Sequence, residues 1–149
     1  MIATPSPIAF SIDRDNGGFR FDGALVIEPG ACSIEVEPRV QALIMRARDH
    51  GNGYRWLDLA GLSFGGRPAW LSLGFHDGAL VRASWNVRLD EVELQDGWPT
   101  REAIDAEIAF VRRILTEEMG IVPGAQPWGE VWSHFDAKGF LAANGIRYR

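Results

Sequence analysis

The residues with the clearest chemical potential are a serine, a histidine and an aspartate that stand almost side by side. Ser133, His134 and Asp136 are the three residue types of a hydrolase triad. The fold brings triad members together, so adjacency in the chain carries little weight. On a strand, Ser133 and His134 would point to opposite faces, and Ser133 does not stand in a Gly-x-Ser-x-Gly sequence, which occurs in this chain only at residues 61–65. We predict no catalytic residues and a protein that is not an enzyme.

The sequence also contains no motif typical of a metal or cofactor site. Zinc sites show at least one close ligand pair, and no such pair occurs among the three histidines, His50, His76 and His134. Residues 13–18 resemble the start of a calcium loop, but the carboxylate required at its last position is replaced by Ala24. Residues 61–66 are rich in glycine without the Gly-Lys-Ser/Thr of a phosphate loop. We expect no metal and no cofactor, and a loop over residues 63–68.

Glu130 is the strongest single candidate for acid–base work. It lies between Trp128 and Trp132 in a predicted strand, where alternation puts all three side chains on one face. A carboxylate flanked by indole rings would have a raised pKa. An equally simple arrangement places this face at the sheet edge, with Glu130 in water. Both alternatives stay open.

An acidic cluster is the candidate partner-binding surface. It comprises Asp90, Glu91, Glu93 and Asp96 and is followed directly by Trp98. One interpretation is a solvated loop. The other is a patch that steers a basic partner into place, with Trp98 as an anchor.

Composition limits the function classes further. At 149 residues the chain has the length of one domain, which we place over residues 1–149. The net charge of −5 argues against a nucleic-acid partner and against docking on an anionic membrane. The lone cysteine, Cys32, cannot form an intramolecular disulfide, and we expect it to be a small buried apolar residue. With no signal-like N-terminus, we expect a cytoplasmic protein.

Periodicity predicts the elements that must position these residues. Alternating runs around Asn16-Gly17 and around Asp77-Gly78 predict two hairpins, the second joining residues 69–75 to 80–89. Residues 101–119 carry an apolar helical stripe, with Thr100 as N-cap and Gly120 at the end. Residues 128–135 and 141–148 are predicted as a final pair of strands.

One stretch is ambiguous. Ile34 and Val36 alternate with glutamates, which indicates a short strand, whereas Val40, Leu43 and Ile44 follow helical spacing. We therefore expect a short helix over residues 38–50. The predicted fold is α+β, an antiparallel twisted sheet of about six to eight strands with one long C-terminal helix and one short helix packed on it.

A family resemblance covers the C-terminal half. The segment from Pro127 to Gly139, with Gly145-Ile146-Arg147-Tyr148, is similar to the C-terminal part of small, mostly uncharacterised bacterial proteins that resemble toxin-immunity proteins. The resemblance implies a non-enzymatic protein-binding module that inhibits a bacterial toxin. The alternatives are a small-molecule-binding domain or small enzyme with an aromatic pocket near Glu130, and a homo-oligomeric structural subunit that uses an exposed sheet edge.

Overall fold

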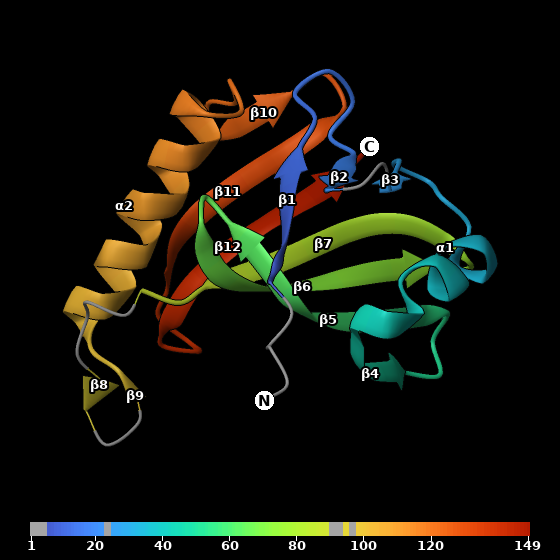
Figure 1. Ribbon diagram of the computed structural model, residues 1–149, viewed down its shortest axis with the longest axis horizontal. Helices are drawn as coiled ribbons and strands as arrows, with labels where there is room; N and C mark the ends of the chain where they lie inside the picture. Colours follow the sequence, from blue (N-terminus) through green and yellow to red (C-terminus); the bar gives the residue numbers. More distant parts are fainter. Residues whose placement is uncertain (1–5, 23–24, 90–93, 96–97) are drawn as a thin grey trace.

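Two long antiparallel hairpins form the centre of the fold (Figure 1). This computed structural model describes residues 6–22, 25–89, 94–95 and 98–149. In it, β5 (Tyr54–Phe64) pairs with β6 (Arg67–His76), and β6 pairs in turn with β7 (Ala79–Val87). Asp77 and Gly78 form the β6–β7 turn with positive φ angles, as such a hairpin turn requires. The predicted hairpin of residues 69–75 and 80–89 is confirmed.

Strands from both ends of the chain extend this centre into one mixed sheet. On the β7 side follow, in order, β12 (Leu141–Tyr148), β11 (Gly129–Asp136) and β10 (Gly124–Gln126). On the β5 side follow β1 (Ile8–Ile12), β2 (Phe19–Phe21) and β3 (Leu25–Ile27), while β4 (Ile44–Asp49) takes another part of the same β5 edge. Only β1 and β5 pair in parallel among the described strands. The predicted α+β class is confirmed, with ten described strands in the sheet and not six to eight.

The long helix α2 (Arg101–Glu117) lies along β11 and β12 and reaches the end of β7 (Figure 1). Its N-cap is Thr100, whose hydroxyl oxygen accepts from the Ala103 N–H at 3.1 Å. Gly120 follows the helix with a φ of 71°. Val111, Ile114 and Leu115 are buried in the main core. The predicted helix and both of its ends are therefore confirmed within two residues. No helix among the described residues combines the length and apolar character that crossing a membrane requires.

The predicted helix over residues 38–50 is wrong. The helix α1 (Ser33–Arg39) begins earlier, where a strand was predicted at Ile34 and Val36, and a 3-10 turn (Gln41–Leu43) leads into β4. Residues 44–49 become a strand because they pair with Arg55–Leu59 on the open edge of β5. Tertiary pairing thus overrides a short helical spacing.

Two loop predictions also change. Residues 63–68 are not a loop, because β5 runs to Phe64 and β6 starts at Arg67, which leaves only Gly65-Gly66 in the turn. The acidic cluster was expected to lie in a solvated loop over residues 90–97, but β8 (Leu94–Gln95) in that segment pairs with β9 (Trp98–Pro99) just after it. The other residues of that segment lie outside the described part of the chain.

Candidate functional site

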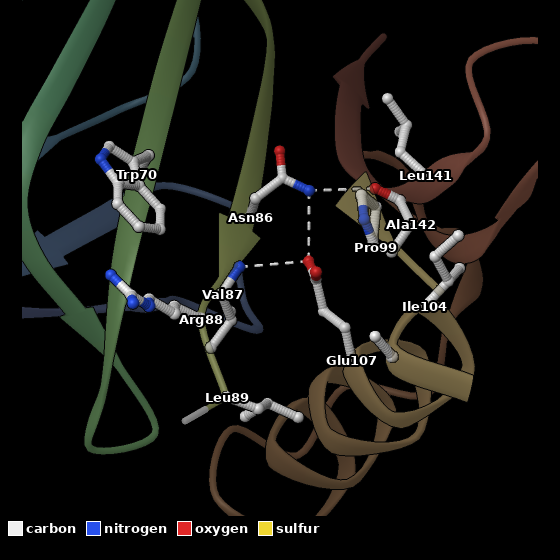
Figure 2. Close-up of a pocket in the computed structure, with 11 residues that line it drawn as sticks. Trp70, Asn86, Val87, Arg88, Leu89, Pro99, Ile104, Glu107, Leu141 and Ala142 are labelled. Atoms are coloured by element: carbon white, nitrogen blue, oxygen red, sulfur yellow. Dashed lines mark hydrogen bonds between the residues drawn. The ribbon is translucent and has the colours of Figure 1, made fainter. Parts of the chain in front are cut away.

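A cavity opens where α2 meets the ends of the central strands, and we call it the α2 pocket (Figure 2). Its volume is about 360 Å³, and its lining is mostly apolar. The lining residues come from β6, β7 and the chain that follows it, β9, α2 and β12: Trp70, Asn86, Val87, Arg88, Leu89, Pro99, Ala103, Ile104, Glu107, Leu141 and Ala142. Concave apolar sites with a few polar groups are where proteins commonly hold small molecules or partner side chains.

Glu107 is the polar centre of the α2 pocket. Its Oε2 accepts three hydrogen bonds: from the Val87 N–H at 3.1 Å, from Asn86 Nδ2 at 3.2 Å and from Asn144 Nδ2 at 2.8 Å. The same two amides also donate to carbonyls, Asn86 to Ala142 and Asn144 to Trp85. The carboxylate therefore connects α2 to β7 and β12, and Figure 2 shows its bonds to Asn86 and Val87 of β7.

The protonation of Glu107 reflects this position. Burial raises the pKa of the carboxyl group above its ordinary value of 4.5, and the hydrogen bonds from Val87, Asn86 and Asn144 only partly oppose that effect. Burial disfavours the charged form because the cavity walls solvate it less well than water does. Perturbed carboxyl groups inside pockets are candidates for functional sites.

Glu130, Trp128 and Trp132 do not gather in one pocket around the carboxylate. Glu130 is exposed, with Oε2 3.8 Å from a guanidinium nitrogen of Arg147. A cavity of about 310 Å³ beside it is lined by neither tryptophan. Trp128 donates from Nε1 to the Arg14 carbonyl at 2.8 Å and packs against the core, whereas Trp132 covers Gly145.

Ser133, His134 and Asp136 serve the sheet and its turn. Ser133 is buried and donates to Asn144 Oδ1 at 2.7 Å, while His134 is exposed, in keeping with opposite faces of β11. Asp136 accepts from the backbone N–H groups of Lys138 and Gly139 in the β11–β12 turn. Cys32 was expected to be buried and is exposed, because it precedes α1 at the surface.

Of the residues predicted to bind a partner, Trp98 lies at the surface and the four acidic residues lie outside the part of the chain that the structure describes. Trp98 lies in β9 with 75% of its surface exposed, next to Pro99 of the α2 pocket. The acidic residues Asp90, Glu91, Glu93 and Asp96 lie outside the described residues. His76 packs against Tyr54 with the two rings tilted and their centroids 4.5 Å apart. In the described ranges, no three His, Cys, Asp or Glu side chains group as metal ligands do.

Sequence reasoning missed Glu107, Asn86, Asn144 and Trp70. One usable signal was present for Glu107: it stands three residues after Ile104 and four before Val111, inside the apolar stripe of α2. A carboxylate on a buried helix face requires polar partners. Nothing in the sequence indicates that those partners come from β7 and β12. Comparison with protein-family models, curated proteins and solved structures finds no match to this chain.

Proposed function

We propose that the protein is a non-enzymatic protein-binding module that attaches to its partner through the α2 pocket, and that the partner is a basic bacterial toxin that it inhibits. One observation carries the proposal. Among the described residues, seven large hydrophobic side chains are exposed. Trp70 and Leu141 of these line the α2 pocket, while Trp98 and Phe140 are sequence neighbours of lining residues. Exposed apolar patches of this kind mark interaction sites.

The charge of the chain supports a basic partner. Residues 90–97 contain four carboxylates and no lysine or arginine, in a chain with a net charge of −5. The residues that flank this stretch in sequence are Leu89, which lines the pocket, and Trp98 beside it. Complementary charge accelerates encounter and helps to select the partner. An immunity-type inhibitor also agrees with the resemblance of the C-terminal half.

Toxin neutralisation tests the proposal directly. Candidate toxins encoded next to this gene would be expressed in bacteria with and without the protein, and growth would be measured. We expect one candidate to be lethal alone and tolerated with the protein. Trp70→Ala and Leu141→Ala should each weaken protection and lower the affinity of the purified complex.

Matched control variants come from exposed apolar residues that do not line the pocket. Ile34 and Met45 are 82% and 62% exposed, so Ile34→Ala and Met45→Ala remove similar apolar surface elsewhere. They should protect as well as the unmodified protein. Full protection by the folded Trp70→Ala and Leu141→Ala variants, or no neutralised toxin at all, would contradict the proposal.

A second candidate, a small-molecule-binding domain or small enzyme, is favoured by the raised pKa of Glu107 inside a cavity of about 360 Å³. This candidate would use Glu107 in place of the Glu130 pocket expected from the sequence. Mass spectrometry of the protein purified under native conditions and then denatured should release a stoichiometric small molecule if it is correct. Glu107→Gln should lower the amount that is retained.

The homo-oligomer alternative stays a prediction. The ends of the sheet order are β10 and β3, each three residues long, and short edge strands offer little for another copy to pair with. Among the described strands, β4 is a longer edge of six residues that pairs only with β5, and it is the edge that such an oligomer would use. Light scattering of the purified protein would give its mass in solution and decide this alternative.

A further inference from the structure

The two oxygens of Glu107 have different surroundings. All three hydrogen bonds that the carboxylate accepts go to Oε2, and none of the hydrogen bonds in the described part of the chain reaches Oε1. The carboxylate sits among the mostly apolar residues of the α2 pocket. A group that fills the pocket displaces water from Oε1 and must supply a donor in its place, because an unpaired buried acceptor is unfavourable.

The walls of the pocket determine the rest of the occupant. Figure 2 shows Trp70 and Leu141 on opposite sides of the cavity, with Glu107 between them. Mostly apolar walls favour an aliphatic chain. The required occupant is therefore an apolar stem that ends in a strong hydrogen-bond donor, and a positive charge strengthens the bond to a carboxylate.

We infer that the α2 pocket receives a lysine side chain of the protein partner, with its ammonium group donating to Oε1 of Glu107 and its methylene stem against Trp70 and Leu141. This inference rests on the proposed function, since it names the group by which the partner attaches. Lysine fits better than arginine because an ammonium group pairs with one oxygen as a point charge, whereas a guanidinium group prefers to span both oxygens. Oε2 already accepts three hydrogen bonds.

Glu107 is the acidic residue among those that line the pocket. Of the described residues that line it, only Glu107 of α2 and Arg88, which follows β7, are charged. The guanidinium group of Arg88 lies beside Trp70 and is turned away from Glu107 (Figure 2). Nearby on α2, Arg101 is paired with Asp105 at 3.0 Å. Glu107 is thus the carboxylate available to a cation inside the pocket.

Three capped amino acids test the inference in the full-length protein. N-acetyl-lysine methylamide supplies the stem and the ammonium group, N-acetyl-norleucine methylamide lacks only the ammonium group, and N-acetyl-arginine methylamide carries a guanidinium group. Binding would be followed through the NMR signals of the Val87 amide and the Trp70 indole. We expect the lysine compound to bind at least about tenfold more tightly than the norleucine compound, as a charge-assisted hydrogen bond provides. The arginine compound should fall between them.

Glu107→Gln is the matched variant, because a glutamine oxygen can still accept from Val87, Asn86 and Asn144 while the charge is gone. It should bind the lysine and norleucine compounds equally. In the unmodified protein, the advantage of lysine should disappear as the pH falls below the pKa of Glu107, and Glu107→Gln should show no such pH dependence.

The outcomes separate the two proposals. Equal binding of lysine and norleucine compounds in the unmodified protein overturns the lysine inference and leaves the pocket as the attachment site. Tighter binding of lysine that survives in Glu107→Gln also overturns it. If neither compound shifts the NMR signals of Val87 and Trp70, the lysine inference fails. The proposed function is still tested separately, by toxin neutralisation with the Trp70→Ala and Leu141→Ala variants.

Discussion

At the scale of single residues, Glu107 has a structural duty that can be separated from its charge. Its Oε2 satisfies three donors that join α2 to β7 and β12. Glu107→Ala leaves those donors without their acceptor, and leaving buried polar groups unpaired costs about 1–3 kcal/mol. Glu107→Gln keeps an acceptor oxygen in the same place. Urea denaturation should therefore show a clear loss of stability for Glu107→Ala and a much smaller loss for Glu107→Gln. Equal losses would contradict the structural role of the hydrogen bonds to Oε2.

Asp58 and Glu107 should contribute to stability with opposite pH dependences. The Asp58 side chain is 6% exposed and contacts Arg46 at 3.0 Å and Arg48 at 2.8 Å. Burial raises its pKa, but hydrogen bonds from Arg48, Ser72 and Arg46 together outweigh burial and hold the pKa below its ordinary value of 3.8. Its contribution to stability is therefore present above that value and is lost as the pH falls through the folded-state pKa.

Glu107 has the reverse sign. Because its folded-state pKa is raised above 4.5, its contribution is largest below that value and declines as the pH rises through the folded-state pKa. The stability advantage of the unmodified protein over Asp58→Asn should thus shrink on acidification. The stability of the unmodified protein relative to Glu107→Gln should instead increase on acidification. Thermal unfolding across pH 3–8 (roughly the range in which carboxyl groups titrate) would measure both trends, and parallel curves would show that one assignment is wrong.

At the scale of elements, the start of α2 forms one side of the pocket. The hydroxyl of Thr100 caps this helix through the Ala103 N–H. Ala103 and Ile104 line the pocket about one turn further on, and Glu107 lines it about two turns further on. Thr100→Ala should cost about 1 kcal/mol, as loss of an N-cap commonly does. The control is Thr116→Ala, since Thr116 is an exposed residue of the same helix that donates back to the Arg112 carbonyl. Hydrogen exchange should rise at Ala103 and Ile104 only in Thr100→Ala, and similar exchange in both variants would contradict the cap.

At the scale of the whole molecule, the two ends of the chain are tied together. Tyr148 in the last strand donates to the Gly17 carbonyl at 2.6 Å, and Trp128 covers Gly17, where an added Cβ would collide with the indole ring. Burial raises the pKa of the Tyr148 hydroxyl, so it stays protonated and remains a donor. The turn between β1 and β2 is thereby held against the end of β12 and the start of β11.

Tyr148→Phe tests this contact. Loss of this part-buried hydrogen bond should lower the free energy of unfolding by about 1 kcal/mol and increase proteolysis in the β1–β2 turn. Tyr54→Phe is the matched control, because the described contacts of Tyr54, with His76 and Arg82, are made by its ring. If both variants lose the same stability, the hydroxyl of Tyr148 does not hold the two ends together.

Elements with local signals could be predicted from the amino-acid sequence. Asp77-Gly78 between alternating runs produced the β6–β7 hairpin, and Thr100 with Gly120 bounded α2, because turn and cap chemistry depends on neighbouring residues. The α+β class followed from the same patterns. Residues 33–49 were mispredicted because a few apolar positions satisfied two periods, and the edge of β5 selected the strand.

The tertiary structure alone decided the site. The α2 pocket joins Trp70, Asn86, Glu107 and Leu141 from four separate elements, and no spacing along the chain relates them. The partners of Glu107 lie 20, 21 and 37 residues away in sequence. Whether a carboxylate is solvated or buried depends on which side chains the fold places around it. For that reason Glu130, favoured by its tryptophan neighbours, is in water, while Glu107 lines the cavity.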